Sequence, residues 1–316
     1  MIILLFGSSG LLGSSILNLF SCQPNLTVVN PSRKEVDLTS SILDLQRYID
    51  SVSPDVIINC AGKIGGLYSQ IKLPADYLAV NVSILNNLFQ ATCASTKRPH
   101  IINFLSTCCF PVDVTYPITP DQLHAGPPHS TNSSYSFAKR LVDTYSSAFY
   151  NQHNLLSTTF ILGNLFGQHD HFSSPETAHV IPSLIMKSFR AVEDQSYVLP
   201  IQGNGAPLRE FLYANDVASM LLSYIVSPLI NTYSTPYLFS NHNEISILDL
   251  ASKIANLVSP DHPIRVQPQS LSDIGQLQKP SCSTPELIAL DIPFTPLETA
   301  LSDVITHYRH HHLRLN

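Results

Sequence analysis

The chain has 316 residues, of which 44% are hydrophobic and 13% are charged, and its formal net charge is −6. A charged fraction near half of the usual ~25%, in a chain of this length, excludes intrinsic disorder and allows a large buried core. Lys and Arg are scattered, and no apolar run approaches the ~18 residues of a membrane span, so we expect neither a nucleic-acid partner nor a membrane partner.

Apolar runs alternate with amphipathic segments through the first half of the chain. The expected strands are residues 2–6, 26–29, 56–58, 101–105 and 157–162, and the expected helices are residues 11–20, 42–52, 75–94 and 133–150. This alternation predicts an α/β fold with a Rossmann-type, doubly wound parallel sheet. Beyond residue 165 it gives way to Pro-rich and polar stretches, which are typical of a smaller C-terminal lobe.

The six cysteines form no Cys-x-x-Cys pair, and the first residues lack the basic segment of a secretory leader. We therefore expect reduced thiols and a cytoplasmic location.

A glycine-rich turn separates the first expected strand from the first expected helix, and it comprises Gly7, Ser8, Ser9, Gly10, Leu11, Leu12 and Gly13. Gly7 permits a tight turn, Gly10 permits close approach of a pyrophosphate, and Gly13 permits the helix to pack on the sheet. The turn predicts a dinucleotide site at the N-terminus of the helix, the alternative being a plain flexible loop.

The segment after the second expected strand decides the cofactor. It reads Asn-Pro-Ser-Arg-Lys over residues 30–34 and lacks the acidic residue that holds a free ribose 2′-hydroxyl. The guanidinium of Arg33 suits a 2′-phosphate, which favours NADP(H), while Asp37 and Leu38 lie where the adenine edge is expected. The alternative is a solvated turn that carries charges.

Tyr135 and Lys139 are four residues apart on an expected helix and share one face. A nearby ammonium is expected to lower the pKa of the phenol, so that Tyr135 exchanges protons near neutral pH. Ser106 follows a strand, at the sheet edge where ligands bind, and is expected to hydrogen-bond the substrate oxygen. The pattern taken alone also fits an ordinary surface pair, but with Ser106 it describes the extended short-chain dehydrogenase/reductases.

Within that superfamily the chain resembles the GDP-L-fucose synthase family. The resemblance extends over residues 1–220 and is carried by segments 59–66 (NCAGKIGG), 105–111 (LSTCCFP), 135–140 (YSFAKR), 179–182 (HVIP) and 207–211 (PLREF). It implies a homodimer joined through the helices near residues 75–94 and 133–150. It also implies NADPH-dependent 3,5-epimerisation and 4-reduction of GDP-4-keto-6-deoxy-D-mannose to GDP-L-fucose.

The resemblance also implies roles for single residues. Ser106, Tyr135 and Lys139 form the reductase triad, and Cys108 and His179 exchange protons beside the ketone. The cofactor is held additionally by Leu162, Gly163, Asn164, Leu165 and His179, and the substrate by Asn164, Lys187, Gln202, Arg209, Asp273 and Lys279. Taken singly, a cysteine at a strand end is usually a core residue, a lone histidine is usually structural, and Arg209 also fits a surface charge. Cys109 is assigned to packing, because alternation along the strand is expected to turn it away from Cys108.

The expected domains are an NADP-binding domain of residues 1–165, to which 211–241 return, and a substrate-binding lobe of residues 166–210 and 242–316. The sequence departs from the family at Leu162-Gly163, at Gln202, where a tryptophan is common, and at Asp273-Ile274-Gly275. A second candidate function is therefore reduction or epimerisation of another nucleotide-linked 4-keto-6-deoxy sugar, and a third is nonenzymatic nucleotide sensing. The histidines at 307 and 310–312 are interpreted as an exposed helix end, and no metal is expected.

Overall fold

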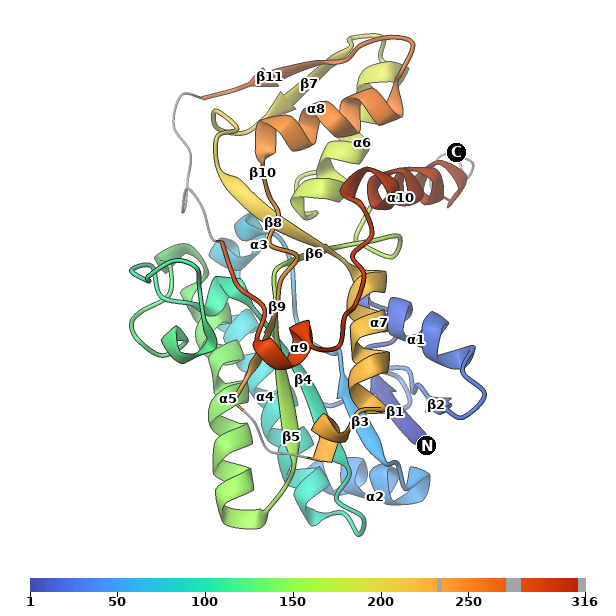
Figure 1. Cartoon of the computed structure of the whole chain (residues 1–316), viewed down its shortest axis with the longest axis vertical. Helices are drawn as coiled ribbons and strands as arrows, with labels where there is room; N and C mark the ends of the chain where they lie inside the picture. The colour runs from blue at the N-terminus through green and yellow to red at the C-terminus, as the bar shows by residue number, and fades with distance from the viewer. Residues whose placement is uncertain (232–234, 271–279, 312–316) are drawn as a thin grey trace.

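The computed structural model describes residues 1–231, 235–270 and 280–311. A six-stranded sheet occupies the lower part of the molecule in Figure 1, and a smaller lobe lies above it. Every neighbouring pair in this sheet is parallel, in the order β2-β1-β3-β4-β5-β9. The strands are β1 (Ile2–Phe6), β2 (Thr27–Val29), β3 (Val56–Asn59), β4 (His100–Ser106), β5 (Ser157–Leu162) and β9 (Tyr237–Phe239). The predicted doubly wound parallel sheet is confirmed.

Alternation of side chains along β1 shows how both faces of this sheet are covered. Ile3 and Leu5 pack in a core with helices α1 (Leu11–Ser21) and α7 (Ala214–Ile225), whereas Leu4 and Phe6 pack in a second core on the opposite face. That second core is completed by α2 (Ile42–Val52), α4 (Pro74–Ala94) and α5 (Ser133–His153). A continuous apolar run is therefore what a strand in this position requires.

Local capping sets the ends of the helices. The side chain of Ser41 accepts a hydrogen bond from the Asp44 N–H at the start of α2, and Ser53 ends that helix in the left-handed region. Helix α5 runs beyond its predicted end, because Asn154 is the residue that adopts the left-handed conformation, at φ 54°. Asparagine tolerates this conformation well, so it ends a helix much as glycine does.

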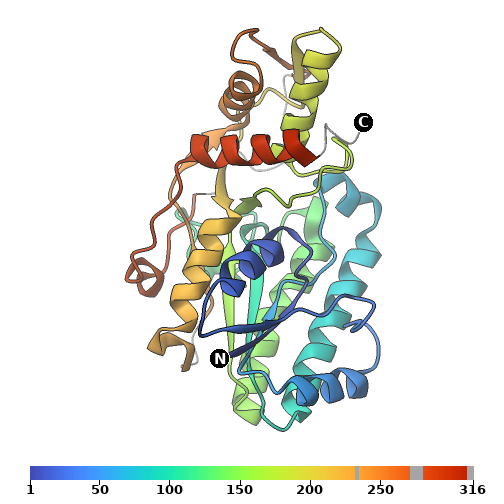
Figure 2. The ribbon, with the colours of Figure 1, turned by 90° about the vertical axis from the view of Figure 1, so that its right-hand side faces the viewer.

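The smaller lobe has its own core and two small sheets. Strands β6 (Asn164–Phe166), β8 (Leu208–Tyr213) and β10 (Glu244–Ser246) form one sheet, and β7 (Val198–Ile201) pairs with β11 (Arg265–Pro268) in the other. Helices α6 (Val180–Glu193), α8 (Ile247–Val258) and α10 (Leu297–His311) pack around the core of the smaller lobe, which Figure 2 shows from the side.

Shorter elements lie in the connections between these strands and helices: α3 (Leu67–Lys72), α9 (Pro285–Ile288) and the single-turn 3₁₀ segments η1 (Thr107–Cys109), η2 (Pro120–Gln122), η3 (Ser130–Asn132) and η4 (Pro228–Asn231). Between β8 and β10 the chain returns to the large sheet, where it adds helix α7 and edge strand β9. Within the described residues, no helix is long and apolar enough to cross a membrane. All six cysteines are free thiols.

Candidate functional site

Two of the three glycines in the turn after β1 occupy positions that no other residue fits. Gly7 has φ +76°, and a Cβ atom there would lie 2.6 Å from the backbone nitrogen of Ala61. A Cβ atom on Gly13 would lie 2.1 Å from the carbonyl oxygen of Gly7, so α1 packs directly on the turn. Gly10 differs, because the nearest atom to its Cβ position is 3.5 Å away and the space around it is open.

The N-terminus of α1 lies beside this open space. Gly10 is the N-cap residue, so no side chain caps the first N–H groups of the helix. The Ser14 hydroxyl donates to the Ser8 carbonyl oxygen at 2.9 Å and holds the turn in place. Uncapped N–H groups at a helix N-terminus attract anions, so the turn fits the diphosphate of a dinucleotide.

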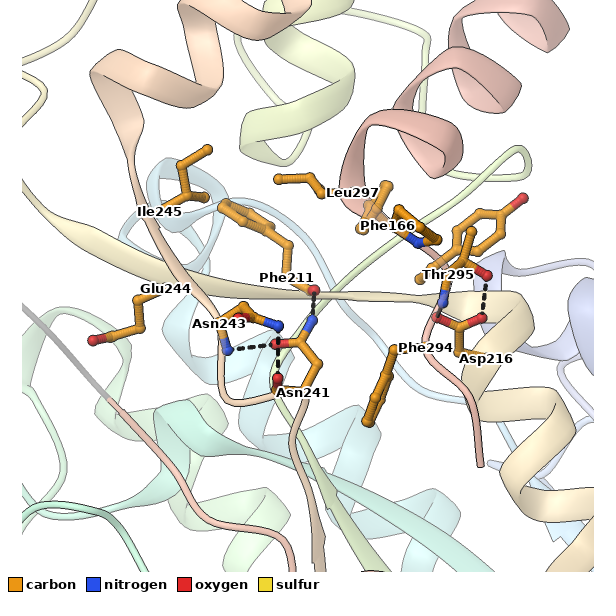
Figure 3. A pocket seen from close by; sticks show the side chains of 12 residues that line it. Phe166, Phe211, Asp216, Asn241, Asn243, Glu244, Ile245, Phe294, Thr295 and Leu297 are labelled. Carbon is orange, nitrogen blue, oxygen red and sulfur yellow. Dashed lines mark hydrogen bonds between the residues drawn. The ribbon is translucent and has the colours of Figure 1, made fainter. Parts of the chain in front are cut away.

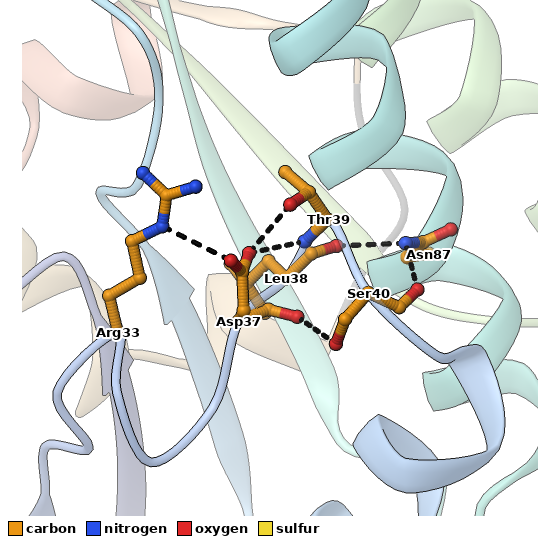
Figure 4. A network of polar contacts seen from close by, with 6 residues as sticks. All are labelled: Arg33, Asp37, Leu38, Thr39, Ser40 and Asn87. Carbon is orange, nitrogen blue, oxygen red and sulfur yellow. Dashed lines mark hydrogen bonds and ion pairs between the residues drawn. The ribbon is translucent and has the colours of Figure 1, made fainter.

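Arg33 lies after β2 and forms an ion pair with Asp37, as Figure 4 shows. Its Nε atom is 3.2 Å from Asp37 Oδ2, and the Arg33 side chain is 77% exposed. The Asp37 carboxylate also accepts from the backbone N–H and the hydroxyl of Thr39, and these bonds, followed by Arg33, lower its pKa. Asn87, on α4, donates to the carbonyl oxygens of Leu38 and Ser40 and thereby fixes the segment that follows Asp37.

The end of β4 is joined to α5 by two hydrogen bonds that pass through the turn η1. The Ser136 hydroxyl donates to the carbonyl oxygen of Cys108 at 3.1 Å, and Arg140 Nε donates to that of Cys109 at 2.6 Å. Ser106 is the last residue of β4, and its side chain accepts from the Cys108 N–H. Ser106 and Cys108 are thereby held against the helix that carries Tyr135 and Lys139.

Electrostatic interactions confirm that these side chains are neighbours. Burial, followed by Cys108 and Cys109, raises the pKa of Tyr135 well above its ordinary value. Burial lowers the pKa of Lys139, whereas the thiols of Cys109, Cys108 and Cys60 act in the opposite direction. The expectation that Lys139 lowers the pKa of Tyr135 is therefore wrong, because desolvation dominates at this depth.

The reason given for the packing of Cys109 is also wrong, although the residue is fully buried. Residues 107–109 form a 3₁₀ turn and not an extended strand, so side-chain alternation does not apply. The two thiols interact with each other, and this interaction is the first cause of the raised pKa of Cys109. Cys60, which follows β3 and is partly buried, is a third thiol in this group, and the sequence interpretation missed it.

The loop after β3 is held against the site by α4. Asn81 is buried, its side-chain oxygen accepts from the Lys63 N–H at 3.1 Å, and its nitrogen donates to the Lys63 carbonyl oxygen at 3.0 Å. Lys63 Nζ lies 5.5 Å from the centre of the Tyr77 ring, which meets the Tyr135 ring edge-on at 6.2 Å. The sequence interpretation missed Asn81 and Tyr77, whose only signal is that polar and aromatic side chains occupy a buried helix face.

His179 is the N-cap residue of α6 and lies on the lobe side of the site. Its Nδ1 atom is 3.2 Å from Oδ1 of Asp170, which raises the pKa of His179, and the sequence interpretation missed this aspartate. A Cβ atom on Gly66 would lie 3.1 Å from the carbonyl oxygens of Thr177 and Ala178, so the loop after β3 contacts the residues just before His179.

The remaining predicted residues come from several elements. Leu162 ends β5, Gly163 follows it, and Asn164 and Leu165 begin β6, where the Asn164 amide donates to the Glu210 carbonyl oxygen at 2.8 Å. In the smaller lobe, Lys187 lies on α6, Gln202 follows β7 and Arg209 lies on β8. Asp273 and Lys279 lie outside the described residues.

A cavity of about 350 Å³ lies at the junction of the two lobes. Figure 3 draws the side chains that line it, and no predicted site residue is among them. Its polar groups are already bonded, since both Asp216 oxygens accept from Thr295 and the Asn241 amide donates to the Phe211 carbonyl oxygen. A second cavity, of about 270 Å³, is lined by residues of α3, η3 and the starts of α4 and α5, including Tyr135. The second cavity therefore belongs to the candidate site, and the first is a seam between lobes.

The C-terminal histidines lie on α10. The ring of His307 is 5.3 Å from that of His169 and 4.3 Å from that of His311, while His312 lies outside the described residues. Among the described residues, no group of three or more His, Cys, Asp or Glu side chains is arranged to hold a metal ion.

Known proteins resemble this chain in both sequence and fold. The sequence profile of the NAD dependent epimerase/dehydratase family matches residues 3–229. GDP-L-fucose synthase of Dictyostelium discoideum is 32% identical over 309 residues, which cover 95% of this chain and 93% of that protein. The probable GDP-L-fucose synthase of Drosophila melanogaster is 31% identical over 288 residues, or 87% and 86% of the two chains. A crystal structure of a GDP-L-fucose synthetase from Naegleria fowleri bound to NADP has a TM-score of 0.85 at 27% identity, over 98% of this chain and 94% of that one.

Proposed function

The chain belongs to the NAD dependent epimerase/dehydratase family and, within it, to the GDP-L-fucose synthases, and from this premise we propose that it converts GDP-4-keto-6-deoxy-D-mannose to GDP-L-fucose with NADPH. This reaction inverts the two carbons that flank a ketone and then reduces the ketone. The protein is on this account an NADP-dependent epimerase and reductase.

One observation carries the proposal: Cys108 lies among the residues that a reductase of this class needs. The Cys108 thiol acts on the pKa of both Tyr135 and Lys139, and the Cys108 N–H donates to Ser106. A reductase alone needs a proton donor and a group that orients the ketone. A thiol at the same place adds a group that can remove a proton from a carbon next to the ketone, as epimerisation requires.

The residues of the larger domain fit NADP(H). Gly7 and Gly13 keep the turn tight against the protein's own backbone, the space beside Gly10 is open to a diphosphate, and the uncapped N-terminus of α1 adjoins that space. The exposed guanidinium of Arg33 suits the 2′-phosphate. Lys139 has no hydrogen bond or ion pair with the described residues, so its ammonium remains available for the nicotinamide ribose. When bound, NADPH supplies the hydride that reduces the ketone.

The side chains of the site divide the remaining work. Ser106 orients the ketone oxygen, and Tyr135 gives that oxygen a proton as the ketone is reduced. The raised pKa of Tyr135 keeps the phenol protonated, which is the form that a proton donor must have. Cys108 and His179 exchange protons with the two carbons that flank the ketone.

We propose the same division of domains as the sequence suggests, with residues 1–165 and 211–241 binding NADP(H). Residues 166–210 and 242–316 then bind the nucleotide sugar. In this lobe Lys187 and Arg209 provide cations for the diphosphate of the substrate, and Asn164 and Gln202 provide amides. Burial lowers the pKa of Lys187, and a bound phosphate would counter this by stabilising the charged form.

We also propose a homodimer that forms through α4 and α5. These helices pack against each other, yet their outer faces leave Leu78 41% exposed and Phe137 48% exposed. Tyr145 and Phe149, about two and three turns further along α5, are only partly buried. A second copy that pairs the same two helices would cover these apolar side chains in a four-helix interface.

Turnover with defined substrates tests the function. NADPH oxidation is followed by the absorbance of the nicotinamide band. We expect one NADPH to be oxidised for each molecule of GDP-4-keto-6-deoxy-D-mannose consumed. We also expect the product to co-elute with a GDP-L-fucose standard in chromatography. Faster turnover of another nucleotide-linked 4-keto-6-deoxy sugar would support the second candidate function. Binding of NADPH and the GDP-sugar without turnover of any sugar would support a sensing role.

A further inference from the structure

We propose that Asp170 is a positioning residue for His179, which it holds so that the other ring nitrogen, Nε2, exchanges the proton with the sugar. This inference rests on the proposed function, because it assigns a residue that acts through one of the two epimerising groups. It concerns the turn that follows β6.

The Asp170 carboxylate is buried in an unusual way. Its side chain is 3% exposed, Oδ1 accepts from the His171 N–H at 2.8 Å and lies 3.2 Å from Nδ1 of His179, and Oδ2 has no hydrogen-bond partner in the described residues. A buried carboxylate is costly unless a charge or several hydrogen bonds compensate for lost water. Among the described residues, His179 is the only basic side chain that pairs with it.

The arrangement fixes which nitrogen of His179 is available. Nδ1 faces the carboxylate and therefore carries a proton that it donates to Asp170. The side chain of His179 is 38% exposed, and no hydrogen bond of Nε2 occurs with the described residues. During epimerisation a proton then moves between the sugar carbon and Nε2, while the Nδ1 proton stays on the side of Asp170 in both protonation states.

Among the charged groups near His179, Asp170 is the one that acts on the pKa of its imidazole. The Asp170 carboxylate raises that pKa against the effect of burial. Glu176, in the loop before α6, bonds to Ser174. The charges of Glu176 and Arg190 act on the pKa of Lys187, further along α6.

A second set of contacts holds the turn that carries Asp170. Two residues earlier, Gln168 Nε2 donates to both carboxylate oxygens of Asp303, on α10, at 2.8 Å. Asp303 also accepts from the Tyr213 hydroxyl at the end of β8. The turn is thus anchored to two elements of the smaller lobe, which keeps the carboxylate in place without help from His179 itself.

The first experiment measures solvent deuterium incorporation into GDP-4-keto-6-deoxy-D-mannose without NADPH, across pH. Asp170→Asn keeps an oxygen that can accept from Nδ1 but removes the charge, so we expect a roughly 10- to 100-fold loss of exchange and a His179 limb shifted to lower pH. Asp194→Asn, the same change at an exposed position that ends α6, is the matched control and is expected to behave as wild type. In a His179→Gln background, Asp170→Asn should add no further loss. Wild-type exchange and pH profile in Asp170→Asn, or fully additive losses, would overturn the proposal.

A second experiment is independent of turnover. The imidazole ¹⁵N signals that disappear in His179→Gln identify this histidine, and their shifts report its tautomer and pKa in the wild-type protein. We expect a neutral form protonated at Nδ1 and a pKa above the ordinary value. A neutral form protonated at Nε2 would overturn the proposal even if Asp170→Asn failed to fold. If the histidine titrates as expected but the wild type exchanges no deuterium and oxidises no NADPH, the proposed function fails and the pairing stands.

Discussion

Replacement of Arg33 by alanine is expected to remove the preference for NADPH over NADH. The structure sets the size of the effect. A hydrogen bond to a charged group contributes about 1.5 to 3 kcal/mol. Because the Arg33 side chain is 77% exposed, water screens its charge and the lower end of that range applies. About 1.5 kcal/mol corresponds to roughly a 10-fold change in the ratio of the two kcat/KM values.

The ion pair with Asp37 reduces this preference only slightly. Asp37 uses the Nε–H of Arg33, which leaves the terminal amino groups of the guanidinium for a phosphate. The Asp37 carboxylate is already bonded to Thr39, so the loss of Arg33 leaves it partnered. We therefore expect Arg33→Ala to fold normally and to keep its kcat/KM with NADH.

The assay compares initial rates with NADPH and NADH for the wild type, Arg33→Ala and Lys34→Ala. Lys34 is exposed, and its replacement by alanine removes the same charge one residue away, so this variant controls for long-range attraction of the cofactor. The reasoning is refuted if the wild type uses both cofactors equally well. It is also refuted if Lys34→Ala changes the ratio as much as Arg33→Ala does.

Four further predictions concern the chemistry, the assembly and the stability of the protein. Tyr135→Phe should lower kcat by about 10²- to 10⁴-fold with NADPH binding unchanged in a fluorescence titration, because only the transferable proton is lost; near-normal kcat would exclude this role. Cys108→Ser should abolish deuterium exchange into the 4-keto sugar far more than it slows reduction, whereas Cys22→Ser, at an exposed thiol, should do neither; undiminished exchange would make Cys108 a packing residue. Leu78→Glu should convert a dimer to a monomer in sedimentation at micromolar concentration, and a monomeric wild type would contradict the proposed interface. Burial lowers the pKa of His100 from 6.5 to about 4, so between these pH values the unfolded chain binds more protons than the folded one. The free energy of unfolding should therefore fall by about 3 kcal/mol as the pH drops from 7 to 4, and this part of the loss should be absent in His100→Gln. An equal loss of stability in the variant would refute this prediction.

Local patterns predicted the fold and part of the candidate site. The apolar run of β1 and the glycine spacing of the turn after it are patterns within short segments, so composition and spacing are sufficient to recognise them. Helix α2 has the predicted bounds because Ser41 and Ser53 set its ends locally. The place of Ser106 at a strand end followed from the same alternation.

Features that depend on contacts between distant residues were missed. Asp170 and His179 meet within an irregular turn after β6, and Gln168 of that turn bonds to α10, which lies more than one hundred residues later in the chain. Asn81, on α4, holds the loop that follows β3. The electrostatic interaction of Cys60 with Lys139 joins the end of β3 to α5. The direction of the Tyr135 pKa depends on burial, which residue spacing does not report.

One measurement tests the central claim most directly: the reaction run to completion in D₂O with NADPH and GDP-4-keto-6-deoxy-D-mannose, with the product analysed by NMR and mass spectrometry. We predict GDP-L-fucose with solvent deuterium at both carbons that flank the former ketone and hydrogen from NADPH at the reduced carbon. A reduced sugar that retains its original configuration and carries no solvent deuterium at those carbons would show a simple reductase, and would contradict the roles given to Cys108 and His179.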